Sequence, residues 1–182
     1  MKKLLTAGIF FIATGSGQLL ADTALNFRFS EDSIKATITT APLITESTSG
    51  EASWLYNDDK DANVANLGFF VNGTRAELSG RAGIKAYGAK IDKDEGGGFA
   101  FGGDGSLRIN EIITAFASVY LGPSYVSFND VESYREWRVG FDFALFKNII
   151  LSASYGELTV ETDRYNKSDI EDGLAIGLKM SF

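Results

Sequence analysis

Two acidic residues on one predicted strand are the first candidates for catalytic chemistry. Glu136 and Asp142 share a face of the segment from Tyr134 to Phe146, and paired carboxylates can act as general acid and general base. Six residues of strand separate them by about 20 Å, and Arg138 lies between them. We therefore favour ion pairing over acid–base catalysis for these side chains. An enzyme that uses these carboxylates alone therefore ranks third among the hypotheses for this chain, after the two non-enzymatic alternatives given below.

Two residue types that often supply catalysis and metal binding are missing. The sequence contains no histidine and no cysteine, which removes the commonest general base and every thiolate ligand or nucleophile. A serine hydroxyl or a water molecule needs a base tuned near neutral pH to become a nucleophile. We expect no catalytic residues, no metal site and no cofactor.

Two motifs begin like ligand-binding loops and then fail. The segment Asp59 to Asn63 starts like a calcium loop, but Val64 stands where the sharp turn needs glycine and Phe70 where a bidentate glutamate belongs. The glycines from Gly98 to Gly103 lack the lysine and hydroxyl residue of a phosphate loop. The first motif is interpreted as a solvated acidic loop, and the second as glycines that ease strand curvature.

The N-terminal segment has the layout of a secretory signal peptide. Lys2 and Lys3 precede an apolar stretch from Leu4 to Ala13, and small residues follow. Residues 1–21 form this predicted signal, with cleavage after Ala21 or, alternatively, after Gly17. Loss of the two lysines takes the net charge from −7 to −9. A chain this acidic is a poor partner for nucleic acid.

Residues 22–182 show the alternation of β-strands. Leu174, Ile176, Leu178, Met180 and Phe182 share one face, and polar or small residues occupy the other. The segment from Tyr134 to Phe146 alternates in the same way, with Phe141 on the apolar face and Arg138 opposite. Further strands are predicted within 25–30, 34–39, 54–56, 65–72, 81–87, 99–101, 113–121 and 149–157. The stretch from Ile113 to Leu121 is apolar on both faces, so its orientation stays open.

The predicted fold is all-β, a closed antiparallel transmembrane barrel of about ten strands, with eight as the alternative. No later segment has the apolar length of a transmembrane helix. In a membrane barrel the apolar faces point to lipid and the charges line the lumen, whereas a soluble lipocalin-like periplasmic barrel has the reverse arrangement. Alternation alone does not distinguish the two. The residues expected to line the lumen of a membrane barrel are Arg28, Lys35, Arg81, Lys85, Glu136, Arg138, Asp142 and Lys179.

Loops and aromatic residues favour the membrane barrel. With the C-terminus in the periplasm, the tight Lys147–Asn148 turn is periplasmic, and the connections 122–133 and 162–172 are long outer loops. The short connection 31–33 and the long connection 40–50 fit this scheme badly. Aromatic residues near predicted strand ends are typical of interfacial girdles. The girdle residues are predicted to be Trp54, Tyr56, Tyr120, Tyr125, Tyr134, Trp137, Tyr155 and Tyr165.

Several motifs resemble those of the YfaZ family of bacterial outer-membrane proteins. The similarity is strongest in the segment 122–128, in 133–136, in Phe146-Lys147-Asn148 and in the ending 172–182. The early segments 54–59 and 67–73 are also similar. The segment Tyr155-Gly156-Glu157 departs from the family pattern. The resemblance implies an outer-membrane barrel and supplies no activity.

The sequence thus predicts a non-enzymatic barrel of the bacterial outer membrane, either structural or a narrow conduit, with a mostly occluded lumen. The runner-up is a soluble periplasmic lipocalin-like barrel that binds an apolar ligand. The expected partners are outer-membrane lipid, lipopolysaccharide and the barrel-insertion machinery, and the sequence identifies no small-molecule ligand. Phe182, a terminal aromatic residue that closes an alternating strand, is the expected membrane-insertion signal.

Overall fold

A computed structural model describes residues 23–163 and 167–182. The predicted signal peptide, both of its cleavage sites and the girdle residue Tyr165 lie outside these residues. The strands are β1 (Thr23–Phe29), β2 (Ser33–Thr40), β3 (Thr48–Asn57), β4 (Ala62–Arg75), β5 (Leu78–Ile91), β6 (Asp94–Arg108), β7 (Ile113–Gly122), β8 (Ser127–Asn129), β9 (Val131–Phe146), β10 (Ile149–Thr162) and β11 (Ser168–Ser181). A 3-10 turn, η1 (Ser124–Val126), joins β7 to β8.

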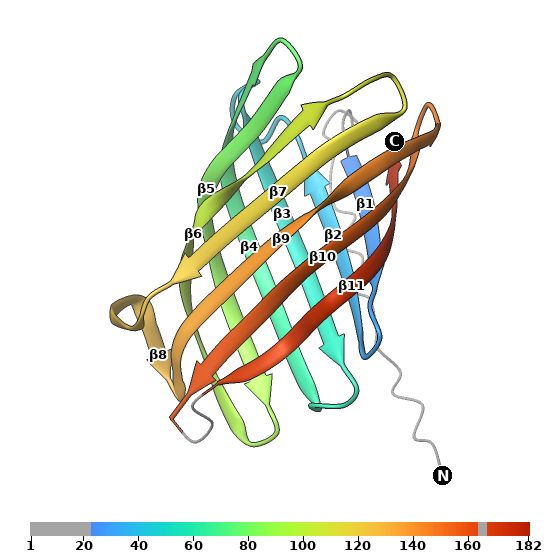
Figure 1. Ribbon diagram of the computed structural model, residues 1–182. Coiled ribbons are helices and arrows are strands. Elements are labelled where there is room, and N and C mark those ends of the chain that lie inside the picture. The colour runs from blue at the N-terminus through green and yellow to red at the C-terminus, as the bar shows by residue number, and fades with distance from the viewer. Residues whose placement is uncertain (1–22, 164–166) are drawn as a thin grey trace.

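Antiparallel pairing closes these strands into a barrel (Figure 1). Each long strand pairs with its neighbours in the chain, and β1 pairs with β11 to close the wall. The short β8 pairs with the beginning of β6, below the part of β6 that pairs with β7. Strands β7 and β8 therefore occupy one position in the wall. The wall has ten positions, which confirms the predicted count of ten over the alternative of eight.

The two ends of the barrel differ in what they carry. The terminal end holds the start of β1, the end of β11 and the connections 41–47, 76–77, 109–112 and 147–148. The opposite, distal end holds the connections 30–32, 58–61, 92–93 and 130, together with the end of β10 and the start of β11. The fully described connections are short at both ends, and 41–47 at the terminal end is the longest of them. The prediction of long outer loops is therefore wrong for 122–133, where η1, β8 and a tight turn replace a loop.

Tight distal turns follow from residue types that tolerate the left-handed backbone region. Asp61, Asp92 and Asn129 have φ values of 44°, 53° and 58°. Short side chains of Asp and Asn hydrogen-bond locally and reduce the cost of this conformation. The acidic and amide residues of these connections therefore serve as turn residues, which explains why the distal hairpins need so few residues.

Alternation along each strand separates an apolar outer face from a mixed inner face. On β9, Val139 and Phe141 are 47% and 49% exposed, whereas Arg138 is 4% exposed. The segment of unassigned orientation, β7, has Val119 and Leu121 outside and Tyr120 inside. Its inward aromatic residues explain why both faces look apolar in sequence. No helix in the described part of the chain is long and apolar enough to cross a membrane.

The aromatic residues only partly follow the predicted girdle. Trp54 stacks on Tyr56, and Trp137 lies 5.9 Å from Tyr155 between ring centroids. All four lie on outward faces of their strands, toward the distal end. Tyr120 and Tyr134 are each 1% exposed and point into the lumen, so their assignment to the girdle is wrong. Residues that fill the interior can also be aromatic, and position near a strand end does not reveal the face.

Candidate functional site

The charged residues predicted to line the lumen all lie on inward faces of their strands. Seven ion pairs join most of them with three further carboxylates in the middle of the barrel. We call this group the central ionic layer. It consists of Arg28, Lys35, Glu51, Arg81, Lys85, Asp104, Glu136, Arg138 and Glu171. Asp142 and Lys179 lie closer to the terminal end and belong to a cavity described below.

Glu136 is the hub of the layer. Lys35 Nζ lies 2.5 Å from its Oε1, and Lys85 Nζ lies 3.0 Å from its Oε2. The Tyr134 hydroxyl donates a hydrogen bond of 2.8 Å to the same carboxylate. Glu136, Lys35 and Lys85 are all buried, with exposed fractions of 5%, 4% and 3%. A buried carboxylate with two ammonium partners and a hydroxyl donor is well compensated.

A second set of contacts extends the layer along β3, β5 and β6. Arg81 Nη2 lies 2.5 Å from Glu51 Oε2, and Arg81 Nε pairs with Asp104. Lys85 Nζ lies 3.7 Å from Glu51 Oε1, which links this set to the Glu136 hub. The Tyr120 hydroxyl donates to Asp104 at 2.7 Å. Arg81 thus bridges two carboxylates on neighbouring parts of the wall.

Glu171 forms the third part of the layer. Arg28 donates two hydrogen bonds to it, from Nε at 3.0 Å and from Nη2 at 2.7 Å. Arg138 Nη2 lies 2.9 Å from Glu171 Oε2, and its Nη1 donates to Ser154 Oγ at 3.2 Å. The two hydrogen bonds from Arg28 form a bidentate pair with Glu171, which is the geometry that a guanidinium and a carboxylate favour. This cluster joins β1, β9, β10 and β11.

Three carboxylates of the layer were missed from sequence. Glu51 precedes the aromatic residues that marked its strand, and Asp104 follows the glycines that were interpreted as easing strand curvature. Glu171 falls within the predicted loop 162–172, but β11 begins at Ser168, with a register shift opposite Leu158 and Thr159. The residues predicted to line the lumen include more cations than carboxylates. This imbalance was the available signal that further inward carboxylates exist, because buried cations require anionic partners.

A row of two glycines and two aromatic residues supports the layer. Phe70, Gly83, Gly102 and Tyr120 are consecutive register partners across β4, β5, β6 and β7. A Cβ on Gly102 would lie 1.9 Å from the Val119 carbonyl oxygen and 2.8 Å from the Tyr120 ring. The rings of Phe70 and Tyr120 therefore lie over the glycines and meet edge to face.

Two cations of the central ionic layer rest on these rings. The Arg81 guanidinium carbon lies 4.2 Å from the Phe70 ring centroid. The Lys85 ammonium lies 3.5 Å from the Tyr120 centroid. Such contacts add cation–π attraction to the ion pairs.

The interior between the layer and the distal end is packed and mostly apolar, with the buried polar residues Asn57, Asp94 and Thr162 at its distal edge. Leu55, Val64, Leu158, Val160 and Ile170 are all 0% exposed. Tyr87 and Tyr134 stack with ring centroids 4.5 Å apart. These residues, with Ala62, Ala89, Ile91 and Val131, form the distal apolar core. Packed side chains fill the lumen on this side of the layer.

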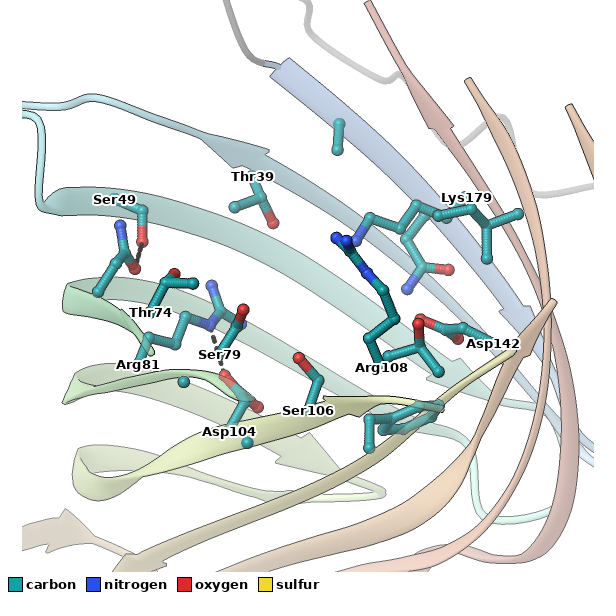
Figure 2. Close-up of a pocket in the computed structure, with 18 of the residues that line it drawn as sticks. Thr39, Ser49, Thr74, Ser79, Arg81, Asp104, Ser106, Arg108, Asp142 and Lys179 are labelled. Atoms are coloured by element: carbon teal, nitrogen blue, oxygen red, sulfur yellow. Dashed lines mark hydrogen bonds and ion pairs between the residues drawn. The ribbon is translucent and has the colours of Figure 1, made fainter. Parts of the chain in front are cut away.

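On the other side of the layer, a cavity of about 570 Å³ opens at the terminal end. Figure 2 shows its labelled lining residues on the surrounding strands. Arg81 and Asp104 contribute to it from the central ionic layer. Asp142 and Lys179 line its wall, and Arg108 reaches into it from the end of β6. The lumen is thus a cup that opens at the terminal end.

The geometry offers no arrangement for acid–base catalysis by Glu136 and Asp142. Glu136 is held by two lysines, whereas Asp142 accepts a hydrogen bond of 2.5 Å from Ser152. Within the described residues, no group of three or more Asp or Glu side chains could hold a metal ion. The acidic connection 58–61 is a hairpin turn between β3 and β4.

A polar network on the outer wall lies distal to Trp137 and Tyr155. Glu157 accepts hydrogen bonds from Trp137 Nε1 at 3.2 Å and from Arg135 Nη2 at 3.1 Å. Lys167 Nζ lies 3.1 Å from Glu157 and 2.9 Å from Asp169. Hydrogen bonds to these two carboxylates raise the pKa of Lys167. The network sets the distal limit of the apolar outer surface on this side.

Phe182 lies at the end of the closing strand. Its side chain is 68% exposed, and its backbone N–H donates to the Thr23 carbonyl at 2.9 Å. The last residue is therefore attached to β1 through its backbone, while its ring is free at the terminal end.

Comparisons with known proteins give one family match and several similar solved structures. A family model described as YfaZ precursor matches residues 1–182. No curated protein matches the chain. The KdgM porin in complex with disordered oligogalacturonate is 6% identical, with a TM-score of 0.49 over 88% of this chain and 99% of that chain.

Two further porin-like structures are similar. The NanC porin is 12% identical, with a TM-score of 0.47 over 88% of this chain and 98% of that chain. The outer membrane channel DcaP of Acinetobacter baumannii is 12% identical, with a TM-score of 0.46 over 93% of this chain. The similarity spans 56% of the DcaP chain.

Proposed function

The chain belongs to the YfaZ family, and we propose that it is a non-enzymatic barrel of the bacterial outer membrane whose lumen is closed to through-flow. The single observation that carries the closed lumen is the stacking of the central ionic layer on the distal apolar core. The central ionic layer joins distant strands of the wall by ion pairs. The distal apolar core fills the lumen between this layer and the distal end with packed side chains. We therefore favour a structural role over that of a narrow conduit.

The direction of the side chains supports a membrane location. Apolar side chains that are at least one-third exposed occur on every long strand of the wall, and they include Leu67, Phe101, Val119, Phe141, Leu174 and Ile176. In water, so many exposed apolar residues would be unfavourable. Contact with the lipid bilayer accounts for these exposed apolar side chains, and it also accounts for the charged side chains that face the lumen.

The soluble lipocalin-like alternative requires the opposite arrangement. It expects Arg138 and Asp142 on the outside and Phe141 in the interior. Arg138 is instead buried at 4% exposure, Asp142 lines the cavity, and Phe141 is half exposed. This inversion favours the membrane barrel over the soluble one.

We infer that the terminal end faces the periplasm. A chain delivered by a signal peptide reaches the membrane from that side, and hairpins can cross while both ends remain behind. The cup then opens to the periplasm, and the distal apolar core closes the outer side. Lipid and lipopolysaccharide are the proposed partners of the outer wall, and the barrel-insertion machinery is the proposed partner of the last strand with Phe182.

Two measurements test this proposal. Fractionation should place a heat-modifiable band in the outer-membrane fraction, whereas a fully soluble periplasmic protein would refute the membrane assignment. In a planar lipid bilayer the purified barrel should give no discrete conductance steps. Reproducible steps from protein whose heat-modifiable folding has been verified would show a conduit instead.

A further inference from the structure

The cavity at the terminal end is lined by hydroxyl side chains, most of which form no side-chain hydrogen bond with a described residue. Seven hydroxyl side chains from six strands point into it, namely Thr37, Thr39, Ser49, Thr74, Ser79, Ser106 and Thr114. In the described part of the chain, only Ser49 among them forms a side-chain hydrogen bond, to Asn72 at 2.9 Å. The remaining hydroxyls are free to bond to water or to a polar ligand.

Two cations at the cavity differ from those of the central ionic layer. Every cation of that layer has a carboxylate oxygen within 3.0 Å. Lys179 forms no ion pair with a described residue, and Arg108 has only the exposed Glu77 at 3.9 Å. Lys179 lies on β11 and Arg108 on β6, on different parts of the wall, and Figure 2 shows the Arg108 side chain extending across the cavity toward Lys179. Both are available to an anionic group.

The acceptors of the cavity are also only partly used. Asn26 Oδ1 is buried and has no hydrogen-bond partner among the described residues. It lies on β1 opposite Lys179 in the register. Asp142 accepts one hydrogen bond, from Ser152, although a carboxylate can accept several. A ligand with hydroxyl groups would supply donors to both residues.

Phe116 adds one aromatic surface to this polar lining. Its ring lies over Gly140, where a Cβ would come within 2.8 Å of the ring. Gly140 is two residues from Asp142 on the same inward face of β9. The C–H faces of a cyclic polyol pack well on such a ring while their hydroxyls reach neighbouring acceptors. The cavity volume falls in the range of about 300–1,000 Å³ that is usual for small-molecule sites.

We propose that the cup is a binding site for a small hydroxylated carboxylate of the sugar-acid class. The carboxylate group lies between Lys179 and Arg108, and its hydroxyls bond to Asp142, Asn26 and the free threonine and serine hydroxyls. The site needs both chemical features of the ligand. An uncharged sugar lacks the partner of the two cations, and a simple carboxylate leaves the hydroxyl groups of the wall unsatisfied.

Titration of the folded barrel tests this site with defined probes. The amide resonances of isotope-labelled protein in lipid nanodiscs are followed by NMR during addition of sodium D-glucuronate, D-glucose or sodium acetate. Glucuronate is expected to shift the amides of the cavity strands saturably, with an affinity about tenfold or more above that of glucose or acetate. Equal weak effects of all three probes, or shifts confined to residues outside the cavity, would overturn the proposal.

A matched pair of variants locates the anion. Lys179→Met removes a cation that has no ion pair to lose, and it should weaken glucuronate binding about tenfold without loss of heat-modifiable folding. Lys147→Met removes an exposed cation of the β9–β10 turn at the same end and should leave binding unchanged. Equal weakening by both variants would indicate a non-specific charge effect and refute the site. Binding does not depend on a closed lumen, so the conductance measurement and this titration can fail separately.

Discussion

Lys35 and Glu136 form an ion pair across the lumen, with Nζ 2.5 Å from Oε1, although β1, β11 and β10 separate their strands on the shorter way round the wall. Both side chains are almost fully buried. The pair therefore joins distant parts of the wall rather than neighbouring strands. Because Lys85 shares the same carboxylate from β5, one residue holds three parts of the barrel together.

Glu136→Gln should strongly destabilise the barrel. The substitution keeps the size of the side chain but leaves Lys35 and Lys85 buried without their shared carboxylate. Loss of one partner from a buried ion pair costs about 3–5 kcal/mol. Urea unfolding of the refolded protein in detergent micelles measures the change. Glu132→Gln, at an exposed position on the same strand, is the control and should change stability by less than about 0.5 kcal/mol. Equal effects would show that the central ionic layer is not a stabilising unit.

Gly102→Ala should destabilise the barrel by about 1–3 kcal/mol, because the new methyl group meets the Val119 carbonyl and the Tyr120 ring. Gly105→Ala on the same strand is its control, since the space around that position is open. Thermal unfolding followed by the gel shift of the folded barrel compares the two. A Gly102→Ala variant as stable as the control would show that the rings are not fixed over the glycines.

Removal of Phe182 should impair assembly in cells while leaving the finished barrel stable. Its ring is exposed, so little packing is lost on deletion. We expect less folded protein in the outer membrane and an unchanged unfolding midpoint after refolding in detergent. Phe146→Ala is the control, because that side chain is equally exposed at the same end. Normal outer-membrane levels of the deletion variant would remove the proposed role of Phe182 as an insertion signal.

The faces of the strands could be predicted from sequence because period two leaves little freedom. Phe141 and Arg138 differ in parity, so one must face outward if the other faces inward. Strands β9 and β11 and the ten-strand wall follow from this rule. It fails for β7, where Phe116 and Tyr120 are inward and apolar. These rings lie over Gly140 and Gly102 of neighbouring strands, and a single strand does not reveal such a cross-strand relationship.

The partners across the lumen could not be predicted in the same way. Alternation shows that Lys35, Lys85 and Glu136 face inward, but it does not fix their relative heights in a tilted, staggered wall. The division of the interior into an apolar core, an ionic layer and a cup depends on those heights. Glu171 was further hidden by the register shift that places β11 ahead of its predicted start. The predicted lengths of the outer connections were too long for a related reason. Strand β8 and the distal end of β11 lie in segments whose sequences are typical of loops.

In the proposed membrane barrel the apolar outer faces contact lipid while the charged faces enclose the lumen, and quenching of a fluorophore by labelled lipid distinguishes this arrangement from its inverse. The absence of cysteine allows single labels at Phe141→Cys on the outer face and at Thr114→Cys in the cup. With a fluorophore on each cysteine and brominated acyl chains in the bilayer, the label at position 141 should be strongly quenched and the label at position 114 should not. The reverse pattern, or equal quenching at both positions, would contradict the membrane barrel.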